Sequence, residues 1–184
     1  MSDPWGLEGA TVAITGASTG IGAALTDAFL DSGAIVLGIS RTPDKHPTTS
    51  PNYRTYAADL SVRSETEALI DTLKADHERI DVLINNAGHA LRAPSVNYPM
   101  DDWDRLIELN LTAPFLLSRG LAPPMLHRGA GKVIFTASLW SFLGGRSVPA
   151  YTVTKSGIAG MIRALSNEWA PQGVQVNGIA PGYI

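Results

Sequence analysis

Residues 10–22 read ATVAITGASTGIG, and this stretch decides the fold. Ala10–Thr15 is a short apolar run, which predicts a buried strand. The glycines that follow predict a tight turn, and Ile21–Ser32 carries apolar residues on one helical face before Gly33 ends the helix. A strand, a glycine-rich turn and a helix in this order begin a β–α–β unit.

The same alternation continues along the chain. Further strands are predicted at Ala34–Ile39, Tyr53–Ala57, Ile80–Ile84, Lys132–Ala137 and Val174–Ile179, with helices at Ser64–His77, Asp101–Arg119 and Ala150–Trp169. The segment Arg41–Pro51 contains three prolines and is predicted to be a loop. Strands joined by helical crossovers form parallel sheets with right-handed connections. The sequence therefore predicts an α/β fold, a doubly wound parallel sheet (Rossmann fold) with six strands.

Composition narrows the class of protein. The 184 residues are 45% hydrophobic and 17% charged, which is typical of a globular domain, so we interpret 1–184 as one domain with a tail at 1–8. There is no cysteine, and the four histidines are scattered, so we expect no metal site. The net charge of −3 argues against nucleic-acid binding. Without a leader or a long apolar segment, we expect a cytoplasmic protein that does not bind membranes.

The glycine turn is a candidate cofactor site. Glycines let the backbone approach a pyrophosphate, and the N-terminus of the next helix offers free N–H groups. The spacing here is G-x-x-x-G-x-G, and such a turn also occurs for structural reasons alone. Its place between the first strand and the first helix favours dinucleotide binding. The candidate residues in it are Gly16, Ser18, Thr19, Gly20, Ile21 and Gly22.

The end of the second strand indicates which dinucleotide binds. An acidic residue is usual there when the cofactor is NAD, because a carboxylate binds the ribose 2′-hydroxyl. This chain has Ser40 and then Arg41, and a guanidinium can bind a 2′-phosphate with two hydrogen bonds. We therefore expect NADP(H), with NAD(H) as the alternative. A solvated loop arginine is the other interpretation of Arg41, and Asp44 is an alternative acid.

Polar residues follow the third and fourth strands as well, where ligands of such sheets bind. Asp59-Leu60 is suited to contact an adenine, although Asp59 is equally typical of an acid before a helix. Asn86, Ala87 and Gly88 let a flat ring pass close to the backbone, or they stabilise the turn. Asn110 lies inside a predicted helix, where asparagine is a poor helix former.

Tyr151 and Lys155 form the most informative pair. Residues four apart on a helix lie on one face, so the phenol and the ammonium can approach each other. An ammonium ion nearby makes the phenolate easier to form, which turns a tyrosine into a proton-transfer group near neutral pH. Ser138 precedes the pair by thirteen residues and ends the fifth strand. A surface Tyr/Lys pair is the alternative.

With these motifs in this order, ending at Pro181-Gly182, the chain resembles a short-chain dehydrogenase/reductase of the single-domain type over nearly its whole length. The resemblance implies that Tyr151 is the catalytic acid/base and that Lys155 assists it and binds the nicotinamide ribose. It implies that Ser138 binds the substrate oxygen and that the Asn110 side chain binds a relay water. Asn86 and Gly88 would then border the adenine-side ribose, and Pro181 and Gly182 the nicotinamide.

The family also has a substrate-covering loop and a seventh strand that this sequence lacks. We therefore expect a chain truncated at its C-terminus, which a mass of 19.5 kDa for the soluble source protein would contradict. The resemblance implies a homo-oligomer, a tetramer in the family. A dimer through the helices at Asp101–Arg119 and Ala150–Trp169 would suit a truncated chain.

Within the family, the stretches LWSFLGG at 139–145 and NEWA at 167–170 are similar to those of gluconate-type and deoxygluconate dehydrogenases. A sugar acid needs a cation for its carboxylate. Arg92, shortly after the fourth strand, and Arg146, in the loop before Tyr151, are the candidates, with Arg92 preferred. A solvated loop arginine is the alternative for each. Trp140 is expected to line the substrate site or the core. A dinucleotide-binding protein without turnover is the competing function.

Overall fold

The structure, a computed structural model, describes residues 6–182. Its centre is one sheet of six strands in the order β3-β2-β1-β4-β5-β6, and every neighbouring pair is parallel. The bounds are β1 (Thr11–Thr15), β2 (Ile35–Ser40), β3 (Tyr53–Ala57), β4 (Val82–Asn85), β5 (Gly131–Thr136) and β6 (Val174–Ile179). This order confirms the doubly wound parallel sheet. From β1 the chain first adds strands on one side (β2, β3) and then on the other (β4, β5, β6). Folds of this kind bind ligands at the point between β1 and β4 where this change occurs.

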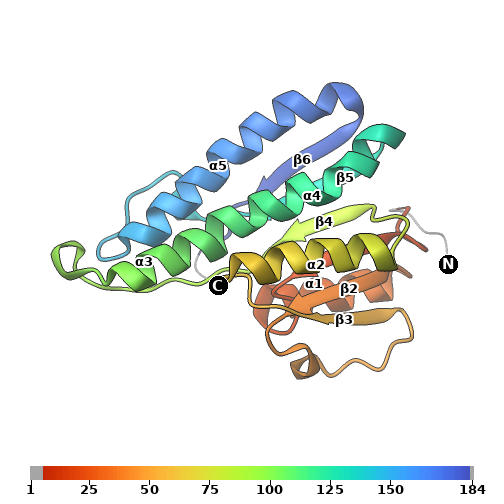
Figure 1. The fold of residues 1–184 in the computed structure, drawn as a ribbon, viewed down its shortest axis with the longest axis horizontal. Helices are drawn as coiled ribbons and strands as arrows, with labels where there is room; N and C mark the ends of the chain where they lie inside the picture. The colour runs from red at the N-terminus through yellow and green to blue at the C-terminus, as the bar shows by residue number, and fades with distance from the viewer. Residues whose placement is uncertain (1–5, 183–184) are drawn as a thin grey trace.

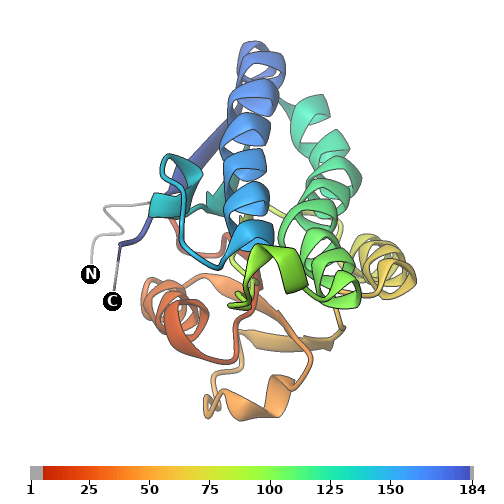
Figure 2. The same cartoon turned by 90° about the vertical axis from the view of Figure 1, so that its left-hand side faces the viewer.

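Helices cover both faces of the sheet. They are α1 (Gly20–Asp31), α2 (Arg63–Asp76), α3 (Met100–Ile107), α4 (Ala113–Arg128) and α5 (Pro149–Trp169). Figure 1 shows α2, α4 and α5 side by side in front of the sheet, and Figure 2 shows α1 on the opposite side. Within residues 6–182, none of the helices has the length and apolar character needed to cross a lipid bilayer.

The burial of both faces explains why β1, β2 and β4 read as apolar runs and not as alternating ones. Val12 and Ile14 of β1 point toward α1 and belong to one core cluster with Ala17. Ala13 between them belongs to the other cluster, which contains Leu117 of α4 among many residues of the three front helices. Each buried aliphatic side chain of this kind contributes roughly 1.5–3 kcal/mol. The two cores fix the positions of the strand ends.

One predicted element differs clearly from the observed structure. The helix expected at Asp101–Arg119 is part of a longer run that a π-helical turn at Glu108–Thr112 divides and that continues to Arg128. Pro123 and Pro124, which lack N–H donors, lie inside α4. The run continues past them because Leu121, Ala122 and Met125 are buried against the sheet.

Candidate functional site

The glycine turn after β1 is hydrogen-bonded to β2 and has no space for a side chain at Gly22. The N–H groups of Gly16 and Ala17 donate to the Ile39 carbonyl at 2.8 and 3.3 Å. A Cβ at Gly22 would overlap the Gly16 carbonyl oxygen, so only glycine allows α1 to start this close to the strand. Gly20 has φ +55°, and a Cβ there would meet nothing within 4 Å. The turn is therefore closely packed at Gly22 and faces open space at Gly20.

A second set of hydrogen bonds joins the carboxyl ends of three strands. The Thr15 hydroxyl oxygen accepts from the backbone N–H groups of Asn86 and Ala87, both at 2.9 Å. The Asn86 side chain donates to the Thr15 carbonyl at 3.1 Å and accepts from the Thr136 hydroxyl at 3.1 Å. Asn86 thus connects β1, β4 and β5. Thr15 and Thr136 were not singled out as site residues, although both close a strand on this edge.

A cleft of about 390 Å³ lies along this edge. It brings together nine of the residues expected to bind a cofactor, contributed by the turns after β1, β2, β3 and β4: Gly16, Ser18, Thr19, Ser40, Arg41, Asp59, Leu60, Ala87 and Gly88. The Ser40 Oγ is buried and has no hydrogen-bond partner among the described residues. A buried hydroxyl without a partner costs free energy, so a ligand atom that pairs with it would be favoured.

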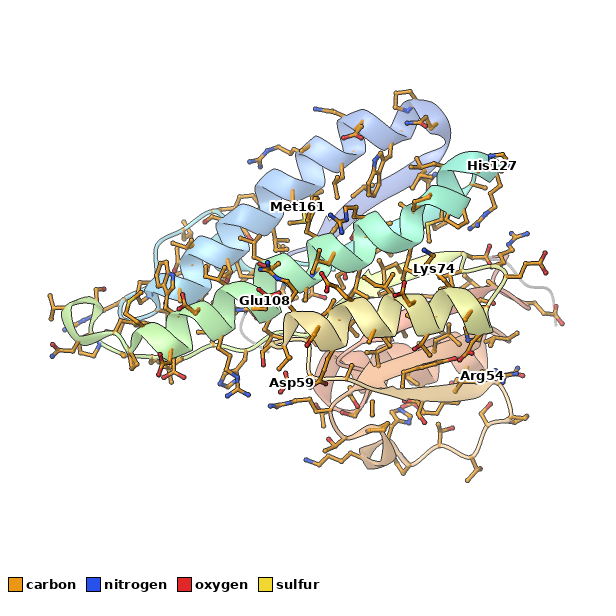
Figure 3. The ribbon with its side chains drawn as sticks, viewed as in Figure 1. Arg54, Asp59, Lys74, Glu108, His127 and Met161 are labelled. Atoms are coloured by element: carbon orange, nitrogen blue, oxygen red, sulfur yellow. The ribbon has the colours of Figure 1, made fainter. Side chains whose placement is uncertain are left out.

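Asp59 sits at the carboxyl end of β3, and Figure 3 shows it beside the start of α2. Its Oδ1 accepts from the N–H and the hydroxyl of Ser61 at 2.9 and 2.6 Å. Burial alone would raise the pKa of Asp59, but these two hydrogen bonds and the charges of Arg41 and Arg105 lower it below its ordinary value. The Oδ1 atom of Asp59 is therefore already bonded to Ser61. The sequence, which suggested an adenine contact for Asp59, did not predict these bonds. The Asp44 side chain lies outside the described part of the structure.

Tyr151 and Lys155 line a second cleft of about 470 Å³ with Ile21, Asn86 and Thr136. Gly88 and His89 line both clefts, so the two adjoin. The Lys155 Nζ lies 5.6 Å from the centroid of the Tyr151 ring and donates to the Thr136 carbonyl at 2.6 Å. Lys155 is only 4% exposed, and this burial lowers its pKa to about 8. It remains largely protonated at pH 7 beside the phenol.

Ser138 is buried at the end of β5, where a short 3₁₀ turn, Leu139–Ser141, begins. Its Oγ accepts from the Trp140 N–H at 3.3 Å, and its own N–H donates to the Ser141 hydroxyl at 3.2 Å. Ser141 in turn donates to the Lys155 carbonyl at 2.8 Å, so the serine turn is fastened to α5. Neither cleft is lined by Ser138 or Trp140.

Asn110 is buried in the π-helical turn, and its side chain makes three hydrogen bonds. Its Oδ1 accepts from the His89 N–H at 2.9 Å, and its Nδ2 donates to the His89 carbonyl at 2.8 Å and to the Thr154 hydroxyl at 3.3 Å. The side chain therefore positions the loop after β4 against α5. The side chain has no free N–H, so the relay water that the family resemblance assigned to it would have to donate to the remaining lone pair of Oδ1.

The remaining candidates flank the clefts. The Ala93 N–H donates to the Ser147 carbonyl at 2.9 Å, which joins the loop carrying Arg92 to the loop carrying Arg146. Both arginines are exposed. On the other side, the Leu139 N–H donates to the Pro181 carbonyl at 3.4 Å, so Pro181-Gly182 lies beside the serine turn. These four residues surround the end of the sheet without lining either cleft.

A parallel sheet with a glycine turn at its first helix, and with two adjoining clefts at the carboxyl ends of its strands, defines a Rossmann-fold protein. Residues 10–184 match the family model described as short chain dehydrogenase. The chain is 41% identical to a 2-dehydro-3-deoxy-D-gluconate 5-dehydrogenase of Pseudoalteromonas atlantica, over 100% of this chain and 76% of the relative. The chain belongs to the short chain dehydrogenase family and is an oxidoreductase.

Solved structures agree with this assignment. A putative NAD(P) dependent gluconate 5-dehydrogenase from Beutenbergia cavernae, with bound NADP, superposes with a TM-score of 0.91 at 38% identity; the match covers 98% of this chain and 74% of that one. A gluconate 5-dehydrogenase from Burkholderia cenocepacia in complex with NADP and tartrate gives a TM-score of 0.87 at 32% identity, with 96% and 72% covered. The expected resemblance to gluconate-type and deoxygluconate dehydrogenases is thus confirmed.

Proposed function

We propose that this chain binds NADP(H) along the two adjoining clefts and interconverts a secondary alcohol and a ketone on a sugar acid. The observation that carries the proposal is the buried Lys155 ammonium beside Tyr151, in a cleft that adjoins the one formed by the glycine turn. The residues fit a dinucleotide, because the turn excludes side chains at Gly22, faces open space at Gly20 and leaves the Ser40 hydroxyl unpaired. The bound nicotinamide supplies or accepts the hydride.

The protein's part in the reaction is proton transfer and positioning. In reduction, the Tyr151 hydroxyl donates its proton to the substrate oxygen, and in oxidation the phenolate removes it. The Lys155 charge stabilises that phenolate, and its effect is strengthened because Lys155 itself is buried. Ser138 donates a hydrogen bond to the substrate oxygen once the substrate is bound. Asn110 acts as a positioning residue through His89, since both N–H groups of its side chain are already bonded, one of them to the His89 carbonyl.

The cofactor residues follow the strand ends. The glycine turn, with Gly16, Ser18, Thr19, Gly20, Ile21 and Gly22, is assigned to the pyrophosphate. Ser40 and Arg41 are assigned to the 2′-phosphate, and Asp59 and Leu60 to the adenine. Asn86, Ala87 and Gly88 border the adenine-side ribose, while Pro181 and Gly182 border the nicotinamide. Support comes from the cleft that nine of these residues line and from the bound NADP described for relatives.

A direct test is the consumption of NADPH and of NADH, followed by absorbance, over a panel of ketones, keto acids and sugar acids. We expect turnover with a sugar acid and a lower KM for NADPH than for NADH. Cofactor binding without turnover on any substrate would instead favour a dinucleotide-binding protein. A lower KM for NADH would contradict the role given to Arg41.

The substrate carboxylate is assigned to Arg92, on the loop that the Ala93–Ser147 hydrogen bond joins to the loop before α5. Replacing Arg92 with Ala is expected to raise the KM for a sugar acid ~10-fold or more, because a charge-assisted hydrogen bond is worth about 1.5–3 kcal/mol. The KM for NADPH should stay unchanged. Arg146→Ala is the matched comparison on the facing loop. A larger effect there would transfer the assignment to Arg146, and two unchanged KM values would remove it.

We also propose that the chain forms a homo-oligomer through α4 and α5. Phe115 on α4 and Val153 on α5 are large apolar side chains that remain 39% and 46% exposed. Apolar side chains on two adjacent helices favour association with a second copy. Sedimentation of the purified chain tests this, and a monomer at micromolar concentration would contradict it.

A further inference from the structure

The segment that follows β2 brings two cations to one end of the cleft that the glycine turn lines. Arg41 comes directly after the strand, and Lys45 ends a short 3₁₀ turn at Pro43–Lys45. Both side chains are exposed and both line the cleft. The buried and unpaired Ser40 hydroxyl lies at the same place in the chain. Lys45 was not among the residues that the sequence suggested, because it lies in a proline-rich stretch that was interpreted only as a loop.

A buried histidine fixes this segment to α1. His46 follows Lys45 and is 6% exposed. Its Nε2 lies 3.4 Å from the Ala23 carbonyl oxygen and 3.3 Å from the Asp27 Oδ1. Because both neighbours are acceptors, Nε2 must carry the proton and donate toward α1. A loop of this composition is otherwise expected to move freely, so the buried ring determines where Lys45 lies.

The histidine is also supported from the sheet. Its ring packs against the ring of Tyr53, with the centroids 5.3 Å apart and the planes at 45°. Burial, and then the charge of Asp27, raises the pKa of Tyr53, so the phenol stays neutral beside the histidine. A Cβ at Gly38 would overlap the Tyr53 hydroxyl. The glycine in β2 therefore makes room for the ring that supports His46.

We propose that Lys45 is a second cationic contact, beside Arg41, for a phosphate on the adenine-side ribose, and that His46 is the positioning residue for Lys45. This inference rests on the proposed function, since it deepens the preference for NADP(H). A phosphate dianion has more acceptor sites than one guanidinium fills, and a lysine on a flexible stem suits the remaining ones. The glycine turn itself contributes Ser18 and Thr19, which are neutral, so the positive charge at this end comes from the segment after β2.

The test compares two cofactor fragments, 2′,5′-ADP and 5′-AMP, by titration calorimetry with the purified chain. Lys45→Ala is expected to raise the Kd for 2′,5′-ADP about 10-fold, because one charge-assisted contact is lost, and to leave the Kd for 5′-AMP unchanged. Lys74→Ala is the matched control, because Lys74 is an exposed lysine on α2 that does not line the cleft (Figure 3). It should leave both affinities at the wild-type value.

His46 is tested with two variants. His46→Ala removes the ring that holds the segment against α1. It should lower the affinity for 2′,5′-ADP about as much as Lys45→Ala does. An unchanged affinity for 5′-AMP would show that the cleft is intact. His46→Gln keeps an N–H donor that can reach the Ala23 carbonyl and should restore most of the affinity. The double variant with Lys45→Ala should be no weaker than either single variant, because both act on one contact.

The outcomes separate this inference from the function it rests on. If the wild-type chain binds 2′,5′-ADP more tightly than 5′-AMP, but Lys45→Ala leaves that ratio within twofold, the proposal for Lys45 is wrong while the NADP(H) preference stands. If Lys45→Ala lowers the affinities for 2′,5′-ADP and 5′-AMP by the same factor, the proposal for Lys45 is also wrong. If the wild-type chain does not distinguish the fragments, the NADP(H) preference fails and the inference fails with it.

Discussion

Replacing Tyr151 with Phe is expected to reduce kcat about 10³-fold while leaving the KM for NADPH within a few-fold of wild type. The change removes only the hydroxyl that exchanges a proton with the substrate, and general acid–base catalysis contributes roughly 10²–10⁴-fold to a rate. The ring that lies 5.6 Å from the Lys155 Nζ is retained, so the cleft keeps its shape. Steady-state kinetics with NADPH and the best ketone of the panel measure the effect.

Tyr56→Phe provides the matched control. Tyr56 lies on β3 and donates to Asp76 at 3.1 Å, and it lines neither cleft, so the same chemical change there should leave kcat unaltered. A Tyr151→Phe chain that reduces ketones at the parent rate would end the case for a tyrosine acid. The family assignment would survive that result, because it rests on the fold and on the comparisons.

Replacing Lys155 with Met is expected to lower kcat at least ~10²-fold and also to change how stability depends on pH. Burial lowers the pKa of Lys155 from 10.5 to about 8. Between these values the unfolded chain binds a proton that the folded chain does not, so the free energy of unfolding rises with pH across this window. Below pH 8 both states are protonated, and the cost of the buried charge, roughly 3 kcal/mol, is present in full.

Methionine fills a similar volume without a charge, so the Lys155→Met chain should lack this rise. Urea unfolding of both chains at pH 7 and pH 10 measures it, and the titrations of other groups cancel in the difference. At pH 7 the variant should be about as stable as wild type, because the relieved charge offsets the lost bond to the Thr136 carbonyl. Parallel stability profiles for the two chains would show that Lys155 is not desolvated as described.

The sequence predicted all six strands to within two residues at each end. The strands Tyr53–Ala57 and Val174–Ile179 match the structure residue for residue, and α5 begins one residue before the predicted Ala150. Both of these strands lie at the edges of the sheet and are only partly buried, whereas the buried strands β1, β2 and β4 were predicted as apolar runs with ends shifted by one or two residues. The residues after β1 to β4 that we assign to the cofactor were chosen because ligands of these sheets bind where the strands end, and nine of them line one cleft.

What the sequence did not predict depends on contacts between distant residues. The π-helical turn at Glu108–Thr112 has no local signature, since it accompanies the bonds that Asn110 makes to His89 and Thr154. The commitment of Asp59 to Ser61 is likewise a matter of side-chain geometry. His46 appeared as one of four scattered histidines, and only the fold brings it against α1 and Tyr53.

The Asn86 hydrogen bonds join residues 71 and 50 positions apart in the chain. Such bonds form only after β1, β4 and β5 have paired in their final register, so this edge cannot assemble in a partly folded chain. Local fraying elsewhere should leave it protected, and amide hydrogens at Asn86 and Ala87 should exchange only through global unfolding. A dinucleotide that binds here would therefore slow the degradation of the whole chain, because it recognises only the completed sheet.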